Sequence, residues 1–256
     1  MNTLKLGRRP RKFHVNTLSL HDYLRDDVLP DPGPQDWTPA VTAAVGTDWG
    51  MDGNDMVGDC AAAMWSHAQM LFTANDGQIV IPTTADTLAL YSAVTGYDPA
   101  QTQPDGSNPT DNGTCMTDLL AYLQKTGAIL AWAEFDPAQI IRYRQAVAIW
   151  GASLNGVQVR QSDEDAFTAG TIWTPQADAV QGGHAILSPK ADANGLTYVT
   201  WGAEQPASAA WTLENTQEAY IVATKEWVKQ ATQLTPAGLD MSKLLADIAA
   251  VKYQPA

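Results

Sequence analysis

The chain has 256 residues, 45% of them hydrophobic and 17% charged, which is enough for one sizeable core built as a single domain or as two packed lobes. Its formal net charge of −13 disfavours nucleic acid and anionic membranes as partners, and no run of about 18 apolar residues predicts a membrane span. Two cysteines are too few for a disulfide framework, which favours a reducing compartment or a fold that is indifferent to redox conditions.

The charge is unevenly distributed along the chain. Residues 1–13 contain five basic residues and no acidic one, so the rest carries a net charge of −18 against −13 for the whole. Residues 30–34 include three prolines and a glycine, which enforce an extended connection. We therefore interpret residues 1–36 as a basic arm and a linker. Such an arm is either a solvated tail or a segment that docks on an acidic surface, for instance of a neighbouring subunit. No apolar stretch follows the basic run, so a secretory signal is not expected.

The first part of the body, residues 37–135, has mainly helical patterns. A short helix is expected at about residues 20–27 of the linker, with Ser19 as its cap. Residues 37–55 are rich in Gly, Thr and Trp and indicate a loop with one short strand. Apolar spacing and terminal glycines predict helices at about residues 60–74, 84–95 and 115–126, and a long surface loop over residues 97–113.

The periodicity then changes to short apolar or alternating runs, at residues 146–159, 183–188, 196–201, 209–213 and 218–223. These runs predict an antiparallel sheet or half-barrel. Helices first and strands second indicate an α+β fold of two lobes, about residues 49–135 and 146–224, within a body that spans residues 37–235. Residues 236–256 follow as an amphipathic C-terminal helix whose apolar stripe docks on the body or in the groove of a partner.

A cysteine stands at the start of the helix expected from residue 60. Gly58 is suited to a tight turn, and Asp59 is a good N-cap residue. Cys60 would then lie where unpaired N–H groups and the helix dipole favour a thiolate. The alternative is that Cys60 is a small buried hydrophobic residue.

A histidine stands at the start of an apolar strand, in the run Gly182-Gly183-His184. The two glycines allow another backbone to approach closely. A lone histidine in this position is usually a structural core residue. With Cys60 on a helix terminus, His184 would instead be the acid–base partner of a cysteine nucleophile. The histidine accepts the thiol proton and later gives it to the leaving group.

These motifs resemble those of the papain-like cysteine peptidases, in the same order, over roughly residues 49–222. The run from Asn54 to Ala61 is similar to the family's Gln-Gly-x-Cys-Gly-Ser-Cys-Trp, the segment around His184 to its histidine strand, and Val199-Thr200-Trp201-Gly202 to its Asn-Ser-Trp-Gly. The set resembles even more closely poorly characterised papain-like proteins of tailed phages and prophages.

The resemblance implies a papain-like two-lobe fold and a site without a cofactor or metal. It implies Cys60 as the nucleophile, His184 as the acid–base, and Asn54 in place of the family's oxyanion-hole glutamine, one methylene shorter. The asparagine that orients the histidine falls on Val199 or, with a shift of one residue, on Thr200. Because strand side chains alternate between faces, only one of these two can face His184.

Other arrangements of the same residues remain open. His67 lies two helical turns beyond Cys60, roughly 10 Å away, and we interpret it as structural. A zinc site made by Cys60, Cys115, His67 and His184 lacks a closely spaced ligand pair. A disulfide between the two cysteines would abolish the nucleophile.

Two functions fit this sequence. The first is a cysteine hydrolase that cleaves peptide or related amide bonds with Cys60, His184, Asn54 and Thr200. The second is a catalytically inactive papain-fold protein of a phage particle, on its capsid surface or tail, held to virion proteins or to further copies of itself by residues 1–36 and 236–256. We expect the host cytoplasm or the virion as its location, and neither a membrane nor nucleic acid as its partner.

Overall fold

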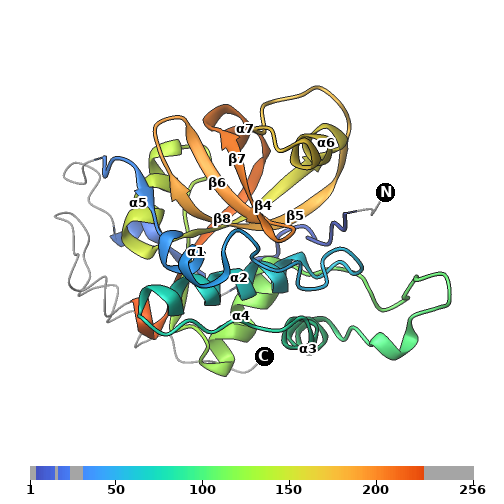
Figure 1. Cartoon of the computed structure of the whole chain (residues 1–256). Helices are drawn as coiled ribbons and strands as arrows, with labels where there is room; N and C mark the ends of the chain where they lie inside the picture. The colour runs from blue at the N-terminus through green and yellow to red at the C-terminus, as the bar shows by residue number, and fades with distance from the viewer. Residues whose placement is uncertain (1–3, 15–16, 24–30, 228–256) are drawn as a thin grey trace.

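The computed structural model describes residues 4–14, 17–23 and 31–227, so the predicted C-terminal helix lies outside the described residues. A layer of helices lies against one side of a strongly curved sheet (Figure 1). This arrangement confirms the predicted α+β class, with helices in the first half and an antiparallel sheet in the second.

The helices are α1 (Pro39–Val45), α2 (Cys60–Asn75), α3 (Thr84–Thr95), α4 (Met116–Thr126), α5 (Ile140–Trp150), α6 (Gln161–Ala169) and α7 (Ala209–Asn215), with short 3-10 turns η1 (Leu20–Tyr23) and η2 (Pro99–Gln101). The strands are β1 (Leu18–Ser19), β2 (Gln35–Asp36), β3 (Ala131–Glu134), β4 (Ser153–Arg160), β5 (Val180–Ala191), β6 (Gly195–Thr200), β7 (Ala203–Ser208) and β8 (Thr216–Ala223).

The three helices predicted for the first half are confirmed to within a residue or so. Helix α3 begins at a reciprocal capping box between Thr83 and Asp86, and both α3 and α4 end at a left-handed glycine, Gly96 and Gly127. Helix α2 is buried over most of its length and packs against β5. A helix that is apolar on all sides belongs in the centre of a molecule, which explains the Ala-rich sequence after Cys60.

The sheet runs in the order β1-β3-β8-β4-β5-β6-β7, with β2 paired to β5 outside this path. All pairs are antiparallel except β1 with β3. Strands β4, β5 and β8 form its middle. Strand β5 carries His184 opposite Val157 of β4, and β6 pairs back on β5. Residues 184 and 200, far apart in an extended chain, thus lie on neighbouring strands.

Three local predictions are wrong. Residues 37–55 contain a helix, α1, which starts at Pro39, a residue suited to the first turn of a helix. Residues 146–159 include the end of α5, because the chain turns at the left-handed Gly151 before β4 begins. Residues 209–213 belong to α7, whose N-cap Ser208 accepts a hydrogen bond from the Trp211 N–H.

The linker helix expected over residues 20–27 is a 3-10 turn at Leu20–Tyr23, and residues 24–30 are outside the described part. In residues 4–14, 17–23 and 31–227, no helix has both the length and the apolar character needed to cross a bilayer.

Candidate active site

Cys60 is the first residue of α2 and is 1% exposed. Burial raises the pKa of its thiol to about 11, although backbone hydrogen bonds from Ala185 and Gly7 act in the opposite direction. With the arm docked, Cys60 is therefore a neutral thiol. The position at a helix start was predicted correctly, but desolvation outweighs the helix terminus in setting the charge.

The two residues before Cys60 act differently from the prediction. Asp59 makes no side-chain capping hydrogen bond, and both of its carboxyl oxygens are buried without a hydrogen-bond partner. Burial raises the pKa of Asp59 to about 8; the nearby Asn54 amide opposes this without forming a well-aligned hydrogen bond. Gly58 does not have a positive φ. A side chain at Gly58 would instead meet Asp111 and the backbone of Gly7 at 3.1 and 3.3 Å.

His184 is held from two sides. Its Nε2 lies 2.7 Å from Thr200 Oγ1, and its ring stacks on Trp201 with centroids 4.5 Å apart and planes at 18°. Thr200, rather than Val199, is therefore the neighbour of the histidine. The second ring nitrogen, Nδ1, is buried and has no hydrogen-bond partner. Burial, and then the positive charge of Arg8, lower the pKa of His184 to about 3, so the imidazole is neutral.

Replacing Thr200 by valine tests this support. Valine keeps the shape of the side chain but leaves the buried Nε2 of His184 unpaired, so we expect the free energy of unfolding to fall by about 1–3 kcal/mol. Urea denaturation measures this loss. Thr200→Ser, which retains the hydroxyl, should keep most of the stability; equal losses in both variants would show that the methyl group matters and the hydrogen bond does not.

Asn54 lies beside the start of α2, but its amide is engaged. Its Nδ2 donates to the Val57 carbonyl at 3.3 Å and to the Lys5 carbonyl at 3.4 Å. The carbonyl of Lys5 is also 3.5 Å from Trp201 Nε1. Two side-chain donors thus converge on one carbonyl oxygen near Cys60.

The other polar candidates lie apart from this centre. His67 Nε2 is 2.9 Å from the Gly50 carbonyl, and burial lowers its pKa to about 4. Both cysteines are free thiols, and Cys115 donates to the Pro10 carbonyl. Across residues 4–14, 17–23 and 31–227, no group of three or more His, Cys, Asp and Glu side chains is arranged to hold a metal ion.

The N-terminal arm runs across the site and covers it. Its backbone donates from Arg8 N to the Gly183 carbonyl at 3.0 Å and from Arg9 N to the Thr114 carbonyl at 2.9 Å. Thr114 N in turn donates to the Gly7 carbonyl at 2.8 Å, and Lys5 N to the Asn54 carbonyl at 3.2 Å. Figure 1 shows this N-terminal segment passing beside α2 and β5. The arm is therefore docked on its own chain as an extended segment, with one isolated parallel bridge between Arg8 and Thr114.

Gly7 lies against the Cys60 thiol. Its N–H, which belongs to the Leu6–Gly7 peptide bond, is directed at the thiol, whereas its carbonyl, which belongs to the Gly7–Arg8 peptide bond, accepts a hydrogen bond from the Thr114 N–H. The arm therefore covers the thiol and blocks the site.

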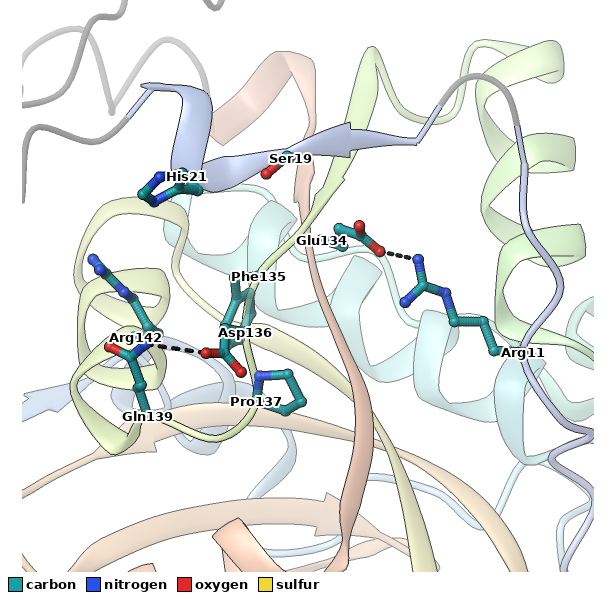
Figure 2. Close-up of a pocket in the computed structure, with 9 residues that line it drawn as sticks. All are labelled: Arg11, Ser19, His21, Glu134, Phe135, Asp136, Pro137, Gln139 and Arg142. Atoms are coloured by element: carbon teal, nitrogen blue, oxygen red, sulfur yellow. Dashed lines mark hydrogen bonds and ion pairs between the residues drawn. The ribbon is translucent and has the colours of Figure 1, made fainter.

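A hollow of about 480 Å³ lies on another part of the surface, between β1, η1 and the segment that joins β3 to α5 (Figure 2). Figure 2 shows Arg11 of the arm directed at Glu134 and Asp136 hydrogen-bonded to Gln139. Neither Cys60 nor His184 lines this hollow. It is a charged surface depression next to the arm and is separate from the candidate site.

Comparison with known structures identifies the architecture. The chain is similar to xylellain, a cysteine protease from Xylella fastidiosa, with 14% identity and a TM-score of 0.55 over 88% of this chain and 98% of that one. It is also similar to digestive procathepsin L 3 of the Tenebrio molitor larval midgut, with 12% identity and a TM-score of 0.52 over 82% of this chain and 76% of that one. The chain has the papain-like fold. No protein-family model and no curated protein matches its sequence.

In this papain-like fold, Cys60 accepts a hydrogen bond from the N–H of Ala185, the residue after His184, and Thr200 lies beside the His184 ring. The assignment of Cys60, His184, Thr200 and Asn54 as a catalytic site stays a prediction. Sequence reasoning missed three participants: the arm itself, Trp201 as a stacking partner, and Glu218, which binds Arg8. A glycine set between basic residues, at Gly7, was the available signal of a close backbone approach.

Proposed function

We propose that this chain is a cysteine hydrolase of peptide or related amide bonds whose site is covered by its own arm. One observation carries the proposal: a peptide segment is bound by backbone hydrogen bonds directly across Cys60 and His184. A surface that holds an extended peptide over a thiol and an imidazole has the parts that acyl transfer requires.

In the proposed reaction, the arm leaves and a substrate peptide takes its place. His184 accepts the thiol proton at Nδ1, the ring nitrogen that has no other partner, while Thr200 holds Nε2 and Trp201 supports the ring. The Cys60 sulfur then attacks the substrate carbonyl carbon, and the amine leaves with the proton that His184 returns to it. A water molecule deprotonated by His184 cleaves the resulting thioester, which releases the acid and restores the thiol. Asn54 Nδ2 and the backbone N–H of Cys60 stabilise the oxyanion, a contribution worth about 3 kcal/mol for one well-placed donor.

Release of the arm would also change the charges of the pair. Burial is the main cause of both the high thiol pKa and the low imidazole pKa, and Arg8 lowers the latter further. When water enters and the Arg8 guanidinium leaves, the pKa of His184 rises, which favours the thiolate–imidazolium form that attacks carbonyls.

A second function is an inactive scaffold. It is favoured by the closed state itself, in which Cys60 and His184 are each 1% exposed and uncharged, and in which the Asn54 amide is bound to the protein's own carbonyls. In that case the papain-like body serves as a structural part, for which a phage particle is the setting we propose.

The test is alkylation of Cys60 by iodoacetamide against pH in a chain with a displaced arm. Gly7→Val provides it, because even a Cβ at this position would lie 1.9 Å from the Gly58 carbonyl oxygen. Cys115, which the same arm covers through Pro10, is the reference thiol within the chain. Mass spectrometry of the two cysteine peptides gives both rates.

For a hydrolase, we expect Cys60 at pH 6 to react at least tenfold faster than Cys115, and His184→Ala to remove this advantage. Ordinary thiols, with a pKa of about 8.5, react slowly there. The Gly7→Val chain should also cleave fluorescein-labelled casein, and Cys60→Ala should abolish the cleavage. If Cys60 titrates like Cys115 and casein stays intact, the scaffold function is the correct one.

A further inference from the structure

The arm buries an arginine inside the candidate site. The Arg8 side chain is 4% exposed, and its Nη1 lies 2.6 Å from Oε1 of Glu218, whose side chain is 1% exposed. The second terminal nitrogen, Nη2, donates to the Gln217 side chain. The guanidinium therefore makes two directed contacts, one of them to a buried carboxylate. This pair is buried on both sides, unlike the pairs of Arg11 with Glu134 and of Lys12 with Asp118.

The body holds the acceptor in place. Glu218 belongs to β8, in the middle of the sheet, and its other oxygen accepts a hydrogen bond from the Tyr220 hydroxyl at 2.7 Å. Space for the ligand comes from Gly156 on the neighbouring β4. A Cβ there would lie 2.8 Å from Arg8 Cδ and 2.5 Å from Glu218 Cγ. The carboxylate is thus preorganised on rigid strands, and a glycine makes room for the arginine stem.

The same cleft selects a glycine before the arginine. The carbonyl oxygen of Gly58 would be 1.9 Å from a Cβ on Gly7, and a Cβ on Gly113 would be 2.0 Å from the Gly7 oxygen. A Cβ on Gly183 would lie 2.6 Å from the Arg8 carbonyl oxygen. Backbones this close leave no room for a side chain at the position opposite Cys60.

We propose that the cleft is a recognition site for extended peptides with a Gly-Arg pair, in which the arginine binds the buried carboxylate of Glu218. The arm is the resident ligand of this site, and a substrate or partner peptide of the same kind replaces it. The inference rests on the proposed function only for what happens after binding.

Charge explains why arginine is required. A bound peptide that excludes water from the Glu218 carboxylate has to supply a cation in its place, because an isolated buried charge is costly. The planar guanidinium donates to the Glu218 carboxylate and also reaches the Gln217 side chain. A lysine ammonium is a compact point charge and cannot make both contacts. The net negative charge of the body further attracts a basic peptide.

The experiment measures binding of a fluorescein-labelled peptide with the sequence of residues 4–12 to the full-length Gly7→Val chain by fluorescence anisotropy. We expect saturable binding. A peptide with Arg8→Ala should bind at least tenfold more weakly, and one with Arg8→Lys should be weakened as well. When Glu218→Gln is added to the Gly7→Val chain, its affinity for the Arg8 peptide should fall. The double variant should then bind the Arg8 peptide and the Arg8→Ala peptide with similar affinity.

A second format avoids dependence on the Gly7→Val substitution. A site for a specific protease is inserted after Phe13, whose side chain is 82% exposed, and the arm of the otherwise unchanged chain is cut after folding. Native mass spectrometry should show the cut arm still bound, and the Arg8→Ala arm released.

Equal binding of the Arg8 and Arg8→Ala peptides in both formats would overturn the proposal, as would an absence of binding when Cys60 has become accessible to iodoacetamide. The hydrolase proposal fails separately. Peptide binding that depends on Glu218, without cleavage of casein, would retain the recognition site and eliminate the enzyme.

Discussion

Replacing Asp59 by asparagine is expected to remove much of the pH dependence of stability between pH 5 and 8. The native carboxyl has a pKa of about 8 because it is buried, whereas in the unfolded chain it ionises at about pH 4. Between these values the unfolded state binds fewer protons than the native state. The free energy of unfolding therefore falls as pH rises, by up to about 1.4 kcal/mol per pH unit.

Asparagine has the same shape and no charge, so the variant lacks this contribution. Urea denaturation at half-unit pH intervals measures the free energy of unfolding of both proteins. Relative to the wild type, that of the variant should increase as pH rises, by an amount on the order of 4 kcal/mol at pH 8. The cost of burying the amide of the new residue is the same at every pH and does not affect this slope. The test is therefore how the difference in free energy of unfolding between the variant and the wild type changes with pH.

Asp165→Asn, a substitution of an exposed carboxylate on α6, is the matched control and should show no comparable trend. A constant difference between the Asp59→Asn variant and the wild type from pH 5 to 8 would contradict the prediction. The variant also bears on chemistry, because an ionised Asp59 raises the pKa of the neighbouring Cys60 thiol. Removing that carboxyl should make the thiol more acidic.

The fold was predictable because its signals are local and repeated. Helices α2, α3 and α4 have long apolar patterns with glycine or turn residues after them, and local geometry then fixes their ends. The errors fall on short elements. The seven residues of α1 or of α7 give too few positions to separate a helical from a strand pattern. A single residue at the helix start then decides: Pro39 in the first turn of α1, or the N-cap Ser208 of α7.

The candidate site was predictable only in part. Motifs gave Cys60 and His184 and left Val199 and Thr200 as alternatives for the neighbour of the histidine, which the structure decides in favour of Thr200. The protonation states were not predictable, because burial sets them and burial is a property of the whole fold. The pairing of Arg8 with Glu218 spans 210 positions, a separation at which no sequence periodicity carries information.

This Arg8–Glu218 pair is the basis of the second large effect, which we expect in a double-mutant cycle. Arg8→Met leaves the buried carboxylate without its cation, which should cost about 3–5 kcal/mol. The arm's few backbone hydrogen bonds contribute about 1 kcal/mol each, so their sum is of the same size as this loss. The arm should therefore detach, so that water reaches Glu218. Hydrogen exchange at the Thr114 amide, which donates to Gly7 in the closed state, reports this opening.

Glu218→Gln added to Arg8→Met should reverse much of the effect, because two uncharged side chains no longer need water or each other. The Thr114 amide should be more protected in the double variant than in Arg8→Met alone, with a coupling free energy of about 2–4 kcal/mol between the two positions. Lys12, paired with Asp118 in the exposed part of the arm at 2.6 Å, is the matched control, and Lys12→Met should change protection little. If the double variant exchanges as fast as Arg8→Met, the buried charge is not what holds the arm, and the backbone contacts of Gly7 must carry its docking instead.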